Sequence, residues 1–394
     1  MGSERRAGVR PCASAVPFGA PHRHLGHSPI PLITVTHAGG QYAVHPEPLA
    51  RTPLRLREAG LAPGLALVVT DATVGGFYLD VLGDALRADG WQPHAVVVPP
   101  GEASKSLSVF GDVVEACLAA GPTRATPVLA LGGGVVGDLA GFAAATLLRG
   151  LPLAQLPTTV LAQVDSSIGG KTGVNTAGGK NLVGAFHAPR FVLADPAVLA
   201  TLPAREVRSG LAEAVKHGLL AGGELLTTLR DETAWEDTLA RIVREAAAVK
   251  AAVVSADERE AGARAFLNFG HTFGHALEAA AGYGTLTHGE AVAVGMRAAL
   301  HLSASLAAGR AVDVLPEPFA AMDALVARLD APPIPDAVTD DALVAAMTRD
   351  KKRDATGLRF VVLDAPGAPR LASGVPEALV RAAWTFARQA RGNA

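Results

Sequence analysis

The segment from Thr158 to Asn181 reads TTVLAQVDSSIGGKTGVNTAGGKN and places two lysines, Lys171 and Lys180, among glycines. Asn181 follows the second lysine directly, and one carboxylate, Asp165, precedes the first lysine by a few residues. Glycines let backbone N–H groups approach a ligand closely. Because two ammonium groups in such a loop favour an anion, the segment predicts a binding site for a phosphate or a carboxylate.

A second glycine-rich motif, GGGVVGD, follows an apolar run that ends at Leu131. Gly132, Gly134 and Gly137 satisfy G-x-G-x-x-G between a predicted strand and a predicted helix, which is the context of dinucleotide-phosphate binding. The motif follows the third strand–helix unit, however, and no acidic residue stands about 20 positions further on to hold a ribose. A tight strand-to-helix turn without a ligand is therefore the alternative.

The second half of the chain holds a candidate metal-ligand set. Glu213 lies in RSGLAEAVKHG, His271 and His275 lie in NFGHTFGHALE, and His288 lies in LTHGEAV. A helix would place His271 and His275 on one face, because they stand four residues apart. One glutamate and two histidines are a common set for catalytic Zn²⁺ with an open position. Spacing does not decide which histidines bind, and His217, four residues after Glu213, is a further candidate.

Cationic residues accompany this set along the sequence. The alternative interpretation of Lys216 is a helical ion pair with Glu213, three residues earlier. For Lys250, Arg264 and Arg149 it is a solvated position on the surface. The cationic residues are Lys216, Lys250, Arg264, Arg149 and the pair Lys351–Lys352.

The elements that would position these groups follow from the apolar pattern. Apolar runs alternate with predicted helices in the first half, which predicts a parallel α/β sheet. After Pro196 almost all predicted elements are helices, so we expect a domain boundary there. The predicted strands are 65–70, 94–98, 127–131, 191–195 and 358–363, and the predicted helices are 72–89, 106–119, 135–148, 204–220, 235–254, 273–281, 291–308 and 318–329.

Polar residues directly follow several of the predicted strands. Ligands of open α/β sheets bind beyond the carboxyl ends of the strands, so we expect these residues to gather on one rim of the sheet. Taken one at a time, each is also an ordinary helix cap or turn residue. The residues are Asp71, Gly101, Glu102, Lys105, Thr158 and Thr159.

Composition bounds the class of protein. The chain has 394 residues, 49% of them hydrophobic and 18% charged, which allows a large core. A net charge of −2 and 5% aromatic residues argue against a nucleic-acid binder. With two cysteines a disulfide framework is excluded, so we expect a cytoplasmic protein.

Two apolar or terminal segments bear on membrane targeting. The run 127–148 contains five glycines and Asp138, which makes it a poor membrane span. Residues 1–31 lack an apolar stretch typical of a secretory signal, and we expect a disordered extension there. A metal-binding role for its three histidines, His22, His24 and His27, is the less favoured interpretation. We therefore expect neither a membrane nor a nucleic acid among the partners.

Taken together, these segments resemble the 3-dehydroquinate synthases, which are NAD- and metal-dependent sugar phosphate cyclases. The resemblance runs from about Leu32 to the C-terminus. It implies an α/β NAD-binding domain with a parallel sheet (32–195), an all-α metal-binding domain (196–394) and a homodimer. It rests on the ordered series LALGGGVVGDLAGFAAA, LRG, PTTVLAQVDSSIGGKTGVN, GKNLVGAFHAP, RSGLAEAVKHG, SADERE, LNFGHTFGHALE, HGEAVAVGM and DKK.

The resemblance also implies site residues at matching positions. The implied ligands of the metal, Zn²⁺ or Co²⁺, are Glu213, His271 and His288. NAD falls on Asp71, Glu102, Lys105, Gly134, Val135, Val136, Gly137, Asp138, Thr158, Thr159, Lys171, Lys180, Val198, Leu199, Ala200 and Thr201. The sugar phosphate falls on Asp165, Lys171, Asn181, Lys216, Lys250, Arg264, Asn268, His275 and Lys351, and Arg149 matches an arginine that reaches the neighbouring subunit's phosphate site.

The implied reaction converts 3-deoxy-D-arabino-heptulosonate 7-phosphate to 3-dehydroquinate and phosphate. Transient oxidation by NAD precedes phosphate elimination, reduction and aldol closure, so NAD is not consumed. His275 is the candidate for proton transfer, because imidazole titrates near neutral pH. The alternatives are an aminodehydroquinate synthase or another sugar phosphate cyclase, a metal-dependent polyol dehydrogenase, and a catalytically inactive binding protein. TAGG between Asn175 and Lys180 departs from the family's usual loop.

Overall fold

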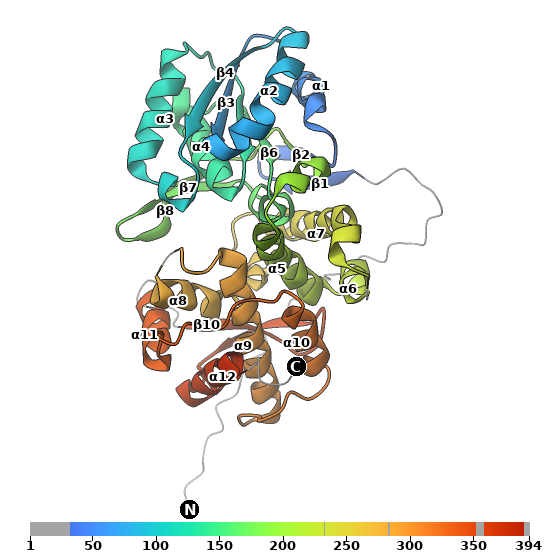
Figure 1. Cartoon of the computed structure of the whole chain (residues 1–394), viewed down its shortest axis with the longest axis vertical. Coiled ribbons are helices and arrows are strands. Elements are labelled where there is room, and N and C mark those ends of the chain that lie inside the picture. The colour runs from blue at the N-terminus through green and yellow to red at the C-terminus, as the bar shows by residue number, and fades with distance from the viewer. Residues whose placement is uncertain (1–31, 232, 283, 352–357, 390–394) are drawn as a thin grey trace, which may run out of the picture.

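The computed structural model describes residues 32–231, 233–282, 284–351 and 358–389, with side chains left undescribed at 349–351. The expected disordered extension, 1–31, lies outside these residues. The first half, blue to green in the upper part of Figure 1, forms a seven-stranded sheet. The order of its strands is β1-β2-β9-β6-β5-β3-β4. Its strands are β1 (Ile33–His37), β2 (Gly40–His45), β3 (Leu65–Asp71), β4 (Gln92–Val98), β5 (Val128–Gly132), β6 (Leu153–Pro157) and β9 (Phe191–Leu193).

Alternation along the buried strands decides which helices cover which face of the sheet. On β3, Ala66 and Val68 pack with the helices α1 (Thr52–Glu58) and α2 (Ala72–Ala88). Leu67 and Val69 face the other way and pack with α3 (Leu107–Ala119) and α4 (Gly134–Thr146). In the order of the sheet, every neighbouring pair of strands from β2 across to β4 is parallel, and within this sheet only β1 runs antiparallel to its neighbour. The predicted parallel α/β sheet is confirmed.

The glycine-rich segment that contains Lys171 and Lys180 is not the loop that the sequence predicts. A short π-helical turn (Ala162–Ser166) is followed by an antiparallel hairpin of β7 (Lys171–Thr176) and β8 (Gly179–Phe186). Gly173 and Gly184 face each other, and a Cβ on Gly184 would lie 2.0 Å from the Thr172 carbonyl oxygen. Gly173 and Gly184 therefore allow close strand pairing, and the hairpin carries Lys171 on β7 and Lys180 on β8.

The second half is built mainly of helices, as predicted. Its short strands, β10 (Arg359–Leu363) and β11 (Pro369–Ser373), pair with each other. The helices are α5 (Ala204–Ala221), α6 (Gly223–Arg230), α7 (Trp235–Ala256), α8 (His271–Ala281), α9 (His288–Ala308), α10 (Phe319–Ala327), α11 (Asp340–Lys351) and α12 (Glu377–Gln389).

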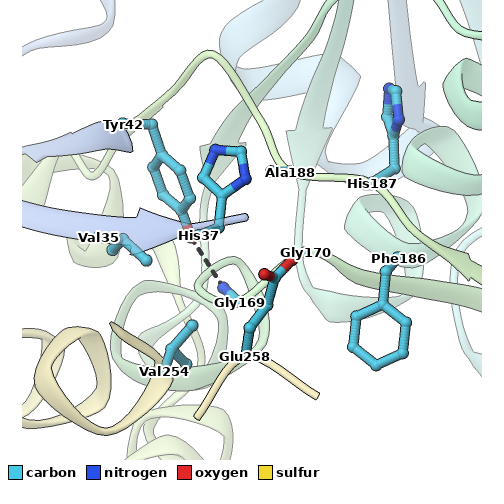
Figure 2. Close-up of a pocket in the computed structure, with 10 residues that line it drawn as sticks. All are labelled: Val35, His37, Tyr42, Gly169, Gly170, Phe186, His187, Ala188, Val254 and Glu258. Atoms are coloured by element: carbon cyan, nitrogen blue, oxygen red, sulfur yellow. Dashed lines mark hydrogen bonds between the residues drawn. The ribbon is translucent and has the colours of Figure 1, made fainter. Parts of the chain in front are cut away.

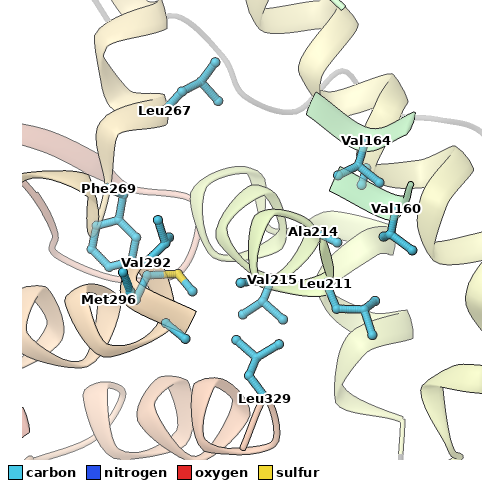
Figure 3. Packing of buried hydrophobic residues seen from close by; sticks show 14 of the residues in the cluster. Val160, Val164, Leu211, Ala214, Val215, Leu267, Phe269, Val292, Met296 and Leu329 are labelled. Atoms are coloured by element: carbon cyan, nitrogen blue, oxygen red, sulfur yellow. The ribbon is translucent and has the colours of Figure 1, made fainter. Parts of the chain in front are cut away.

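One hydrophobic cluster joins the two halves. It contains Leu129 and Val160 from the first half and Val215, Val292 and Met296 from the second, part of which Figure 3 shows. Within the described residues one helix, α9, is long and apolar enough to span a membrane by length and composition. Inside the protein 78% of its most apolar window is buried. The cluster gives both sides of the site described below a common packed support.

Candidate functional site

Three helices bring a glutamate and two histidines together. Glu213 on α5 presents Oε1 at 3.5 Å from His271 Nε2 on α8 and 3.6 Å from His288 Nε2 on α9. The Glu213 side chain is 1% exposed, and Oε1 has no hydrogen-bond partner within the described part of the chain. A buried acceptor without a partner costs free energy, so this oxygen fits a bound cation. The three residues satisfy the requirement for a metal-ligand set by position.

Local sequence fixes where the two histidine helices begin. Gly270, with φ +77°, precedes α8, and a Cβ there would lie 2.7 Å from Met296 Cγ on α9. α9 begins with a capping box, in which the Thr287 side chain accepts from the Glu290 N–H and the Glu290 side chain accepts from the Thr287 N–H. Such a box satisfies two N–H groups at the helix start. His271 and His288 are therefore each the first residue of a firmly anchored helix.

Charges around the set favour an ionised carboxylate. Burial alone would raise the pKa of Glu213, but the Lys216 ammonium and the neighbouring histidines hold that pKa well below its usual range. Burial and the Lys216 charge lower the pKa of His271. Against the effect of burial, contacts with the carboxylates of Glu213 and Glu278 raise the pKa of His288 to about 9. A cation entering here would therefore displace a proton from His288.

A second buried cluster surrounds Asp165. Asp165 Oδ1 accepts from Lys250 Nζ at 2.7 Å, lies 3.2 Å from His217 Nε2 and stands 4.0 Å from Lys216 Nζ. Although burial would raise it, these cations and the His217 contact hold the pKa of Asp165 well below its usual range. Lys216 Nζ also pairs with Glu213 Oε2. Lys216 thus links this cluster to Glu213, His271 and His288, which we call the metal-type set.

The glycine turn before the hairpin is clamped from two sides. Its Gly169 N–H donates to Tyr42 Oη at 2.9 Å, and its carbonyl oxygen accepts from Arg264 at 3.4 and 3.5 Å. Figure 2 shows the Tyr42 ring on β2 reaching toward Gly169 in a small pocket that Glu258 and His187 also line. Burial raises the pKa of Tyr42 to about 12, so its hydroxyl stays neutral. The clamp holds the chain immediately before Lys171.

Both lysines of the hairpin contact carboxylates of the second half. Lys171 Nζ pairs with Glu260, whose other oxygen accepts from Asn268 Nδ2 at 2.8 Å. Lys180 Nζ donates to Glu278 Oε1 at 3.0 Å. In this structure protein carboxylates therefore face the cations that the sequence predicts to bind an anionic ligand.

The chain matches family models over most of its length. The model for the N-terminal part of 3-dehydroquinate synthase matches residues 95–209, and the model for its C-terminal part matches residues 210–353. The chain belongs to the 3-dehydroquinate synthase family. A relative from Salinibacter ruber, a 3-dehydroquinate synthase, is 49% identical over 352 residues, which cover 88% of this chain and 94% of the relative.

Solved structures of sugar phosphate cyclases share the fold. A 2-deoxy-scyllo-inosose synthase, solved with carbaglucose-6-phosphate, NAD⁺ and Co²⁺, is 26% identical with a TM-score of 0.77, covering 90% of this chain and all (100%) of that one. A 2-epi-5-epi-valiolone synthase from Streptomyces hygroscopicus subsp. jinggangensis, solved with NAD⁺ and Zn²⁺, is 28% identical with a TM-score of 0.77, covering 94% and 99%.

The polar residues predicted on the rim of the sheet make different kinds of contact. Lys105 Nζ lies 2.5 Å from both Asp138 Oδ2 on α4 and Asn181 Oδ1 on β8, which ties the sheet rim to the hairpin. Asp71 caps α2 by accepting from the N–H groups of Thr73 and Val74, as its alternative interpretation has it. The buried Thr158 Oγ1 has no hydrogen-bond partner among the described residues.

For several predicted site residues, the structure shows no side chain at the site. Val198 and Leu199 are buried in the hydrophobic core, so only their backbone is available to a nucleotide. Arg149 is exposed at the end of the short 3₁₀ turn (Leu147–Arg149) that follows α4, at the opposite end of that helix from the glycine motif. Lys351 ends α11, and its side chain lies outside the described ones.

Sequence reasoning missed Glu260, Glu278 and Tyr42 as members of the site. Glu260 ends SADERE and Glu278 ends LNFGHTFGHALE, so both stood in quoted segments without an assigned role. A carboxylate in a cation-rich site was the available signal. Glu260 also has a left-handed backbone, φ +61°, which is uncommon for a residue other than glycine. No comparable signal marked Tyr42, which is distant in sequence.

Proposed function

We propose that this chain catalyses the 3-dehydroquinate synthase reaction, converting 3-deoxy-D-arabino-heptulosonate 7-phosphate to 3-dehydroquinate and phosphate. Besides the family match, one observation carries the proposal. A buried glutamate oxygen without a partner faces two histidines, and the Lys216 ammonium joins this set to the Asp165–Lys250 cluster. A hydroxyl-rich, doubly anionic substrate suits such a combination of a cation site with fixed charges.

Glu213, His271 and His288 would hold one divalent metal, Zn²⁺ or Co²⁺. When bound, such a metal acidifies a substrate hydroxyl that coordinates to it. Two solved relatives contain NAD⁺ together with Co²⁺ or Zn²⁺. In this chain the start of α4 has no side-chain cap, so N–H groups there are available to the phosphates of NAD. When bound there, NAD would supply a reversible hydride acceptor.

When substrate binds, its two anionic ends would replace the protein's own carboxylates as partners of the cationic side chains. Arg264, Lys250 and Asn268 are assigned to the substrate carboxylate. The phosphate is assigned to Lys171, Asn181, His275, Lys351 and the partner subunit's copy of Arg149. Glu260 now contacts one residue of each set, Asn268 and Lys171, so a bound substrate would replace it at both. His275 is exposed on α8, four residues after His271, and would transfer protons beside the metal without binding it.

Three broader features belong to the same proposal. The exposed position of Arg149, away from its own chain's rim, supports a homodimer in which each subunit completes the other's phosphate site. A boundary near Pro196 would separate the NAD-binding domain, 32–195, from the metal-binding domain, 196–394. The cytoplasm is the proposed location, as the cysteine content favours.

A product analysis tests the proposal. Purified protein would be incubated with the heptulosonate phosphate, catalytic NAD and Zn²⁺, with chelator-treated protein as the control. We expect stoichiometric phosphate release, the product mass of 3-dehydroquinate by mass spectrometry, and no net NADH. Steady NADH accumulation with a simple polyol, without phosphate release, would instead identify a polyol dehydrogenase. Product only from an amino-substituted substrate would identify an aminodehydroquinate synthase.

A further inference from the structure

Glu278 is a buried carboxylate with no role in the proposed reaction. Its side chain is 6% exposed, although it lies on α8 among charged groups. Oε1 accepts from Lys180 Nζ at 3.0 Å, and Oε2 lies 3.5 Å from His288 Nδ1. Burying a carboxylate is costly unless it is paired, and here each oxygen has a different partner. The two partners come from opposite halves of the chain.

The contact with His288 falls on the ring nitrogen opposite the metal-type set. His288 Nε2 is the nitrogen that faces Glu213 Oε1, whereas Nδ1 faces Glu278. An imidazole that offers Nε2 to a metal must carry its proton on Nδ1, and a carboxylate beside Nδ1 favours that tautomer. Glu278 therefore stands where it would orient the His288 ring for a cation.

By position Glu278 could itself be a ligand, in a second set with His275 and His288. The hydrogen-bond pattern favours Glu213 in that role. Glu213 Oε1 faces the Nε2 atoms of both His271 and His288 and accepts no hydrogen bond within the described residues, whereas Glu278 Oε1 already accepts from Lys180 Nζ and Glu278 Oε2 faces the Nδ1 atom of His288. A cation would satisfy Glu213, but it would have to displace Lys180 or His288 from Glu278.

The contact with Lys180 reaches across to the hairpin. Lys180 lies on β8 next to Asn181, and Asn181 Oδ1 lies 2.5 Å from Lys105 Nζ at the sheet rim. One carboxylate thus joins a helix of the metal-type set to the strand that carries two predicted ligand-binding residues. Ordering either end of such a bridge lowers the cost of ordering the other.

We propose that Glu278 is a positioning residue that ties the metal ligand His288 to Lys180, so that metal binding and the order of the β7–β8 hairpin are coupled. The inference rests on the metal site of the proposed function. It adds that the two ligand-binding regions communicate through one buried side chain.

The test uses Glu278→Gln, which keeps the side-chain size and removes the charge. Glu245→Gln is the matched control, because Glu245 is a largely buried carboxylate that pairs with Arg241 on α7, away from the site. Zn²⁺ affinity of the full chain would be measured by chelator competition, and hydrogen exchange would be followed at residues 171–186. We expect about 10- to 100-fold weaker Zn²⁺ binding in Glu278→Gln and wild-type affinity in the control.

Hydrogen exchange tests the coupling itself. We expect Zn²⁺ to slow exchange in the hairpin of the wild type and to leave it unchanged in Glu278→Gln. Lys180→Met should also abolish this slowing, at a smaller loss of Zn²⁺ affinity, since His288 keeps its carboxylate. Should Glu278→Gln fail to fold, Lys180→Met alone decides: preserved slowing overturns the inference.

The possible failures can be told apart. Tight Zn²⁺ binding by the wild type with unaltered affinity and unaltered slowing in Glu278→Gln overturns this inference and leaves the proposed function standing. No Zn²⁺ binding by the wild type overturns the metal site, and the inference with it.

Discussion

The metal-type set and the hairpin lysines present opposite electrostatic states. Glu213 is 1% exposed and pairs with Lys216 through Oε2, whereas its Oε1 accepts no hydrogen bond within the described residues, so one oxygen of this anion is left for a further cation. Lys171 is 51% exposed and pairs with Glu260, so the hairpin has a cation already satisfied by the protein. The first region is assembled before a ligand arrives, whereas the second must exchange partners when an anion binds.

Burial explains why the two regions differ. Removing one partner from a buried charged group costs about 3–5 kcal/mol, whereas an exposed ion pair contributes about 0–1 kcal/mol. A fixed helical frame can hold the buried set, since its members begin or line packed helices. The hairpin can release Glu260 at little cost, which suits its proposed role in binding and releasing a phosphate. Three substitutions test this difference, and they are described from the largest expected effect to the smallest.

His271→Ala would remove one histidine from the buried set. We expect metal content to fall from about one ion per chain to near zero, and activity to fall at least about 1,000-fold, since a catalytic metal supplies several kcal/mol. Metal analysis and phosphate release would measure both. His94→Ala, at an exposed position on β4, is the control and should keep the metal. Full metal content in His271→Ala would refute the ligand assignment.

Lys171→Ala would remove the cation that Glu260 now satisfies. If the substrate phosphate replaces Glu260, KM should rise about 10- to 100-fold, because a hydrogen bond to a charged group contributes about 1.5–3 kcal/mol. Metal content should stay unchanged. Steady-state phosphate release measures KM. Arg381→Ala is the control, because Arg381 forms an exposed ion pair with Glu377 on α12. A normal KM would show that the hairpin lysine has a structural role alone.

Tyr42→Phe would remove one hydroxyl from the clamp on the glycine turn. The Gly169 N–H would lose its acceptor, so we expect the free energy of unfolding to fall by about 1–3 kcal/mol. Urea denaturation measures this change. Tyr78→Phe removes a hydroxyl that bonds to Val198 O nearer the surface, and should cost less. Equal effects would mean that the clamp contributes no more than an ordinary surface contact.

The regular elements were predictable because their apolar periods are strong. The strand predicted at 65–70 is β3, the helix predicted at 72–89 is α2, and the helix predicted at 235–254 is α7. The hairpin was mistaken for a loop, since its glycines and polar residues lack the alternation typical of a strand. Close pairing of Gly173 with Gly184 is a contact between two strands, and composition does not reveal it.

By itself, the sequence determined the family, the sheet with its helical second half, and the residue types that could bind a metal and an anion. Only the tertiary structure decided the partners. It placed Glu213 Oε1 between two histidines with no hydrogen bond from the described residues, put Glu260 against Lys171, and set Glu278 between His288 and Lys180. Motif spacing reports neighbours along one element, whereas these contacts join elements that meet only when the shared core packs.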